Sequence, residues 1–113
     1  MEVQPREIKR YITIDGRIPF AEWLDNLRDN KVETVINKRL DRVSHGNLGD
    51  YRSVGEGVLE LRIDYGPGYR VYFGQIDTTI VLILCGGDKS TQSQDILRAI
   101  EYWIDYRRRK NAN

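Results

Sequence analysis

Cysteine and histidine are nearly absent from the chain, which has Cys85 and His45 as its only examples. A single cysteine cannot form an internal disulfide, and this fits a reducing cytoplasm. Without a cluster of Cys and His, no zinc site is expected. The longest apolar run, residues 80–85, is six residues long, whereas about 20 are needed to span a bilayer. No apolar stretch follows the first charges, so no signal peptide is expected and we predict a cytoplasmic protein.

The sequence also lacks a strong charge of one sign, because 18 Lys and Arg face 17 Asp and Glu. Most nucleic-acid-binding domains carry a basic excess. Residues 58–105 contain four basic and seven acidic side chains, so an anion site there must be a small constellation and not a broad field. The exception is residues 107–110, RRRK. This run either contacts RNA, DNA or an acidic partner segment, or is a solvated helix end.

The N-terminal half predicts a strand and two helices within one domain that spans residues 1–113. Apolar and polar residues alternate over residues 7–14, as in a strand. Pro19 is suited to the first position of a helix, and an apolar stripe follows it. Asn30 and a glutamate three positions later resemble the capping box of a second helix, which Gly46 would end. Together the helices predict an αα-hairpin.

From residue 50 the apolar period changes from helical spacing to two. Residues 59–63 and 69–73 predict two strands joined by a glycine- and proline-rich turn. Residues 79–85 are apolar on both faces, which is typical of a central strand, and a shorter strand near 50–54 is possible. The order β-α-α-β-β-β-α predicts an α+β domain: a small antiparallel meander sheet covered by the helical hairpin and a C-terminal helix.

The last helix is predicted to begin at a capping box formed by Thr91 and Gln94 and to run to about residue 109. Its apolar stripe is expected to include Leu97 and Ile104. Before it lies the stretch LCGGDKSTQ, in which the apolar strand is expected to give way to a charged loop. Lys89 in this loop precedes a helix N-terminus, where backbone N–H groups favour anions.

The hydrophobic pattern sets the register of the predicted hairpin, and it pairs Leu61 with Val71. The same register places Arg62 opposite Arg70 on the other face, which is unfavourable unless another charge compensates. Glu60, diagonal to Arg70, is one candidate, and a bound phosphate is another. The arginines are therefore either a solvated, ion-paired surface or an anion site that includes Lys89.

The stretches LELRIDYGPGYRVYFGQ and LCGGDKSTQSQDILRAIEYW resemble the RelE/ParE toxin superfamily, and within it the HigB-like, phage-related addiction module killer proteins. The resemblance implies the toxin of a type II toxin–antitoxin system. RelE-like and HigB-like members cleave mRNA in the ribosomal A site. The reaction needs neither metal nor other cofactor: the ribose 2′-OH attacks the adjacent phosphate and leaves a cyclic phosphate.

The resemblance also implies roles for single residues. Arg70 matches the arginine that holds the scissile phosphate, and Arg62 matches a position that binds phosphate or supports Arg70. Lys89 stands where a basic residue stabilises the transition state or protonates the leaving group. The sequence departs from the pattern at Val58 and Glu60, where RelE-like members have lysines.

The resemblance leaves two candidates for the general base. RelE-like members have a tyrosine near the position of Asp95, and HigB-like members often use His or Asp there, so either Asp88 or Asp95 is a candidate base. A carboxylate in that role needs a raised pKa. Tyr72, on the same strand face as the arginines, is the best candidate for stacking on an RNA base. Trp23 and Trp103 lie on apolar helical stripes and are expected in the core.

Two other functions are compatible with the same residues. ParE-like relatives share the arginine strands but inhibit DNA gyrase by binding, and a phage-derived module without toxicity is a third possibility. The toxin interpretations imply a cognate antitoxin, a small helix-turn-helix protein that blocks the Arg62 and Arg70 face or lies across the helices. The remaining expected partners are the ribosome and mRNA, with DNA contacted only through the antitoxin complex and no membrane.

Overall fold

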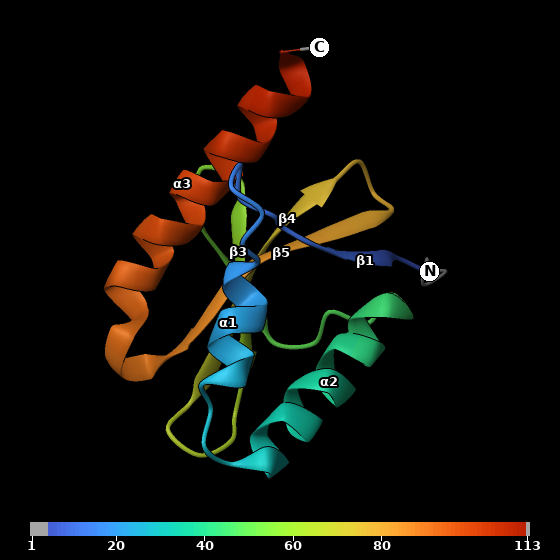
Figure 1. Ribbon diagram of the computed structural model, residues 1–113. Helices are drawn as coiled ribbons and strands as arrows, with labels where there is room; N and C mark the ends of the chain where they lie inside the picture. The colour runs from blue at the N-terminus through green and yellow to red at the C-terminus, as the bar shows by residue number, and fades with distance from the viewer. Residues whose placement is uncertain (1–4, 113) are drawn as a thin grey trace.

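The structure is a computed structural model that describes residues 5–112 (Figure 1). Its N-terminal elements are β1 (Glu7–Arg10), α1 (Pro19–Asp25) and α2 (Asn30–Ser44). Four strands follow: β2 (Tyr51–Gly55), β3 (Val58–Ile63), β4 (Tyr69–Ile76) and β5 (Ile80–Asp88). A 3-10 turn, η1 (Lys89–Thr91), leads into the long C-terminal helix α3 (Gln92–Asn111).

The strands form one sheet in the order β1-β5-β4-β3-β2. β2 to β5 are a consecutive antiparallel meander, and β1 adds to the outside of β5 in parallel. The predicted α+β class and the meander are therefore confirmed, and the possible strand near 50–54 is β2. Residues 80–83 lie inside the sheet between β1 and β4, as the apolar pattern of residues 79–85 predicts, and residues 84–88 have β4 on one side only.

Helices cover both faces of this sheet, and each face has its own core. α1 and α2 pack on one face, where Phe20, Leu24, Val32, Ile36 and Leu40 meet Leu61, Val71, Phe73 and Ile83. α3 packs on the other face, where Ala99 and Trp103 meet Val58, Tyr72, Leu82 and Leu84. In Figure 1, α3 is drawn in orange to red, α1 in blue and α2 in green, and α3 lies apart from the other two helices.

The strand expected over residues 7–14 is wrong in its second half, because β1 ends at Arg10. The chain leaves the sheet after the amide of Tyr11, which donates to the carbonyl of Ile83. Ile12 and Ile14 are 49% and 84% exposed. The alternation of apolar and polar residues at positions 11–14 therefore does not mark the buried face of a strand.

The expected loop after residue 85 is also wrong, since β5 continues to Asp88 and pairs with β4 throughout. A bulge makes this continuation hard to read from the sequence. Tyr72 pairs with Cys85 and Phe73 pairs with Ile83, so Leu84 is an extra residue. As a result, Leu84 and Cys85 both pack toward α3 although they are consecutive.

The two glycines in this stretch are explained by packing on both sides of β5. A Cβ on Gly86 would overlap the ring of Trp23 in α1. A Cβ on Gly87 would overlap the carboxylate of Asp95 in α3. Glycine is therefore required because two helices approach the strand closely from opposite faces.

Helix boundaries differ from expectation by a few residues. Asp29, and not Asn30, caps α2 by accepting a hydrogen bond from the amide of Lys31. Thr91 is the N-cap of α3, as expected, but its side chain makes no capping hydrogen bond, so the box with Gln94 is wrong. Asp88 instead caps the preceding turn η1, in a capping box that includes Thr91. Leu97 is 64% exposed and belongs to no apolar face of the helix.

Over residues 5–112, no helix is long and apolar enough to cross a membrane.

Candidate functional site

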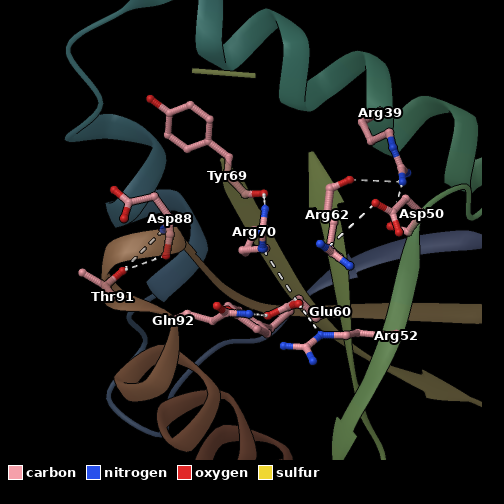
Figure 2. Close-up of polar contacts among 11 residues, drawn as sticks. Arg39, Asp50, Arg52, Glu60, Arg62, Tyr69, Arg70, Asp88, Thr91 and Gln92 are labelled. Atoms are coloured by element: carbon pink, nitrogen blue, oxygen red, sulfur yellow. Dashed lines mark hydrogen bonds and ion pairs between the residues drawn. The ribbon is translucent and has the colours of Figure 1, made fainter. Parts of the chain in front are cut away.

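Arg62 lies directly opposite Arg70 in the pairing of β3 with β4, as the hydrophobic register predicts. Both side chains are on the face of the sheet that carries α3. Because like charges at a directly opposed pair repel, the arrangement needs compensating acids. Figure 2 shows that two different carboxylates supply the compensating negative charge: Asp50 lies beside Arg62, and Glu60 lies beside Arg70.

Glu60 is the centre of this polar cluster and has no exposed surface. One carboxylate oxygen accepts from Arg52 Nε at 2.9 Å and lies 3.9 Å from Arg70 Nε. The other accepts from the Tyr72 hydroxyl at 3.0 Å and from Gln92 Nε2 at 2.8 Å. Burial alone would raise the pKa of Glu60, but the hydrogen bonds outweigh it and hold the pKa below its usual range. The expected role of Glu60 as the counter-charge to Arg70 is therefore confirmed.

Arg70 is the most buried cation of the cluster, with 7% of its surface exposed. Its Nη1 donates to the carbonyl of Tyr69 at 3.1 Å. Its buried Nε has no hydrogen-bond partner among the described residues. The guanidinium end lies beside Gly68, whose φ of +86° and lack of a side chain leave room next to Nη1 and Nη2.

Arg62, Arg70 and Lys89 line one cavity of about 400 Å³ at the turn end of the β3–β4 hairpin. We call it the arginine cavity. Asp50 and Asp64 also line it, together with the hairpin turn. Three cations thus face two carboxylates, and the cavity keeps one net positive charge. Guanidinium and ammonium groups in this number suit a single phosphate and not an extended polyanion.

Asp88 and Asp95, the candidate bases, do not line this cavity. They line a second cavity of about 570 Å³, which we call the edge pocket, between α1, α3 and the end of β5. Lys89 follows Asp88 directly in the chain, yet the two side chains open into different cavities. These carboxylates and Arg70 therefore line different cavities. Asp95 nevertheless packs against Gly87, the residue that pairs with Arg70, so the expected catalytic group of Arg70 with these carboxylates stays a prediction.

The two aspartates of the edge pocket have opposite electrostatic environments. Hydrogen bonds from the hydroxyl and amide of Ser90 lower the pKa of Asp88. Burial raises the pKa of Asp95, and the hydrogen bond from the Thr91 hydroxyl at 2.5 Å offsets this only in part. The pKa of Asp95 is therefore shifted in the direction that a carboxylate base requires, and the pKa of Asp88 is shifted in the opposite direction.

Tyr72 is not available for base stacking, because its exposed fraction is 0%. Its ring packs in the core under α3, and its hydroxyl donates to Glu60. Trp103 is buried in the same core, as expected. Trp23 packs at the edge of the other core and also lines the edge pocket.

Three polar residues of the cluster carried no role in the sequence interpretation. Arg52 lies opposite Glu60 in the β2–β3 pairing, and Gln92 reaches Glu60 from the first residue of α3. Arg39 extends from α2 and donates to the carbonyls of Leu48, Asp50 and Arg62. The alternation of side chains along β2 could have predicted that Arg52 faces Glu60. The contacts of Arg39 and Gln92 come from helices and depend on tertiary packing, so no local sequence pattern predicts them.

The fold and this site define a small α+β protein with a compact cation cluster at one end of its sheet. No family model matches the chain. It is 47% identical over 88 residues to an uncharacterized protein of Haemophilus influenzae, and the match covers 78% of this chain and 89% of that protein. The chain belongs to the same family as this Haemophilus protein.

Proposed function

We propose that the chain is the toxin of a type II toxin–antitoxin system, and that it cleaves mRNA on the ribosome in the cytoplasm. The observation that carries this proposal is the convergence of Arg62, Arg70 and Lys89 on the arginine cavity. These are the residues that the resemblance to RelE-like and HigB-like toxins assigns to the scissile phosphate. They come from two strands and a 3-10 turn, so only the fold brings them together.

The cavity suits a transesterification in which the ribose 2′ oxygen attacks phosphorus. The bond from phosphorus to the 2′ oxygen forms and the bond to the 5′ oxygen breaks, which leaves a 2′,3′-cyclic phosphate and a 5′-OH. Arg62 and Arg70 bind the non-bridging oxygens and stabilise the charge that grows on them. Lys89 donates a proton to the leaving 5′ oxygen.

The base that takes the proton from the 2′-OH must lie within hydrogen-bond reach of it. Asp50 and Asp64 are the carboxylates that line the arginine cavity. Asp50 Oδ2 is 3.9 Å from Arg62 Nε, so it already lies beside a phosphate-binding cation. In this proposal one of these two carboxylates replaces Asp88 and Asp95 as the general base.

A second candidate function is inhibition of DNA gyrase by binding, as in ParE-like relatives. The specific observation that favours it concerns the two positions where RelE-like toxins have lysines. Val58 and Glu60 stand there, and both are fully buried. β3 therefore contributes fewer cations to the cavity than a RelE-like nuclease has.

The two functions are separated by inducing the wild-type chain and Arg70→Ala in cells and mapping new 5′ ends on mRNA. A nuclease gives cuts inside translated codons that disappear in Arg70→Ala. Arg28→Ala, which replaces an exposed arginine in the α1–α2 connection, is the matched control and keeps the cuts. Growth arrest with DNA-damage signalling and without mRNA cuts identifies the gyrase function. The absence of both mRNA cuts and DNA-damage signalling would contradict both toxin proposals.

The proposed partner is a cognate antitoxin, a small helix-turn-helix protein that neutralises the toxin and carries the complex to DNA. A complex that covers the arginine cavity would protect Lys89 from amine-reactive labelling. Equal labelling of Lys89 with and without the antitoxin would place the antitoxin across the helices instead.

A further inference from the structure

The outer edge of β5 has no strand partner beyond the end of β1. Pairing with β1 stops at Arg10 and Ile83, whereas β5 continues to Asp88 with β4 on its other side. Over residues 84–88, therefore, no described strand covers the outer backbone edge. The edge pocket lies here: residues 85–88 line it along the strand, Trp23 lines it from α1, and Asp95, Arg98 and Tyr102 line it from α3.

Asp95 brings a buried carboxylate to this pocket, with 6% of the residue exposed. Its Oδ2 accepts the hydrogen bond from Thr91. Its Oδ1 accepts no hydrogen bond from the described residues, and Arg98 Nη1 lies 4.0 Å away, too far to donate. Oδ1 is not among the buried atoms that lack a partner, so it opens into the pocket. The cleavage reaction proposed above does not use this group, so its open acceptor is available to a ligand.

The walls of the pocket identify the chemistry that fits it. Trp23 and Tyr102 give flat apolar surfaces, Asp95 offers an acceptor, and Arg98 offers donors. The unpaired edge of β5 adds backbone N–H and C=O groups. A volume of about 570 Å³ is that of a small-molecule site. Because side chains of α1 and α3 flank the strand edge in this pocket, it suits a flat ring better than an added peptide strand.

We propose that the edge pocket binds a nucleobase and that Asp95 and Arg98 read its edge. Guanine fits best, since it presents two adjacent N–H groups that a carboxylate accepts and an O6 that an arginine donates to. The assignment of this base to the RNA substrate rests on the proposed function. Gly87 in the edge pocket pairs directly with Arg70 of the arginine cavity, and paired residues are about 5 Å apart. A single nucleotide can thus place its base in one cavity and its phosphate in the other.

The direct test uses guanosine, which has the base without the phosphate. Titration of the ¹⁵N-labelled chain is expected to shift the amides of Gly86 and Gly87 and the indole N–H of Trp23. Asp95→Asn and Arg98→Ala each weaken guanosine binding by about tenfold or more, since an arginine or carboxylate contact to a base edge contributes about that much discrimination. Leu97→Ala, an exposed position on the same helix, leaves the affinity unchanged.

Two results would overturn the nucleobase site. One is the absence of shifts at Gly86, Gly87 and Trp23 at millimolar guanosine. The other is binding that Asp95→Asn and Arg98→Ala both leave intact. The dispersed amide spectrum of each variant shows that it is folded, so weaker binding is not mistaken for unfolding. Stronger binding of cytidine, adenosine or uridine at the same amides would keep the site and reject guanine as its ligand.

A second measurement separates this inference from the proposed function. Arg70→Ala is expected to abolish mRNA cleavage and to leave guanosine affinity unchanged, because its side chain lines the other cavity. Asp95→Asn is expected to remove the base preference beside the cut, which is measured as the distribution of bases at the cut sites and not as the cleavage rate. An unchanged preference would reject the role of the pocket in substrate choice. Guanosine binding by a chain that never cuts mRNA would reject the nuclease and leave the site in place.

Discussion

Arg52 and Glu60 lie directly opposite each other in the pairing of β2 with β3, and a 2.9 Å ion pair joins their side chains. The arginine end is half exposed, while the glutamate end has no exposed surface. Glu60 is thus held from the solvent side by Arg52 and lies against Arg70 on the inner side. The negative charge of Glu60 stabilises the nearly buried Arg70, which lies beside Arg62 on the same face of the sheet.

Glu60→Ala is expected to destabilise the protein by about 3–5 kcal/mol, the usual cost of removing one partner from a buried ion pair. The substitution leaves the buried charge of Arg70 without its carboxylate and removes the acceptor of Tyr72 and Gln92. Urea denaturation of the two proteins measures the difference in the free energy of unfolding.

The matched control for this change is Glu101→Ala, since Glu101 is exposed on α3. It is expected to change the free energy of unfolding by no more than about 0.5 kcal/mol. A loss for Glu60→Ala as small as that of the control would contradict the central place of Glu60 in the cluster.

The opposite pKa shifts of Asp88 and Asp95 predict substitutions with opposite pH dependence. Burial raises the pKa of Asp95, so its ionised form costs stability once the pH exceeds that raised value. Asp95→Asn should therefore stabilise the protein at neutral pH. The gain should disappear as the pH falls through the raised pKa toward the unfolded value of about 3.9.

Asp88→Asn is the comparison on the same stretch of chain. Hydrogen bonds from Ser90 lower the pKa of Asp88, and a lowered pKa stabilises the folded state above the unfolded value. This substitution should destabilise at neutral pH, and the loss should shrink as the pH falls through the lowered pKa. Urea denaturation from about pH 3 to pH 7 measures both curves. Parallel curves for the two variants would contradict the assigned environments.

Gly86→Ala is expected to destabilise by about 1–3 kcal/mol, the cost of overpacking a core position. The added Cβ would overlap the Trp23 ring, so the same change in a Trp23→Leu background should cost less. A double-mutant cycle measured by thermal unfolding isolates this coupling. Equal costs in the two backgrounds would mean that Gly86 is required for a reason other than the approach of α1.

The sheet and the facing arginines could be predicted because they depend on period-two alternation in residues 59–63 and 69–73. That pattern fixes which residues share a face, and hence that Arg62 meets Arg70. Glu60 could be named as a counter-charge for the same reason. The α2 helix followed from its apolar spacing, with an error of one residue at its cap.

The arrangement of the candidate base could not be predicted, for two physical reasons. The bulge at Leu84 changes which side chains face α3, and a one-residue change in register has no compositional signal. The glycines 86 and 87 are typical of a turn, but here they admit Trp23 and Asp95 against an unbroken strand. Tyr72 was placed on the correct face, yet α3 covers that face and buries the ring.

The salt dependence of RNA binding tests how many phosphate contacts the arginine cavity makes. Each cation that neutralises a phosphate of single-stranded RNA contributes about 0.7 to the slope of log K against log salt concentration. Because the cavity is proposed to hold one phosphate, Arg62→Ala and Lys89→Ala should each reduce the magnitude of the slope by up to about that amount on a 2′-deoxy-blocked oligonucleotide, which binds but cannot be cleaved. Fluorescence anisotropy over a series of salt concentrations measures the slopes.

Arg28→Ala is the control for this series, because Arg28 is exposed on the α1–α2 connection and lines neither cavity. Its slope should equal that of the wild-type chain. If all three variants reduce the slope equally, the RNA follows a diffuse surface charge and not the arginine cavity. If Arg62→Ala and Lys89→Ala leave the slope unchanged, the cavity holds no phosphate. The near-neutral net charge of +1 makes the first of these results hard to reconcile with the composition, so the cavity itself is expected to account for the slope.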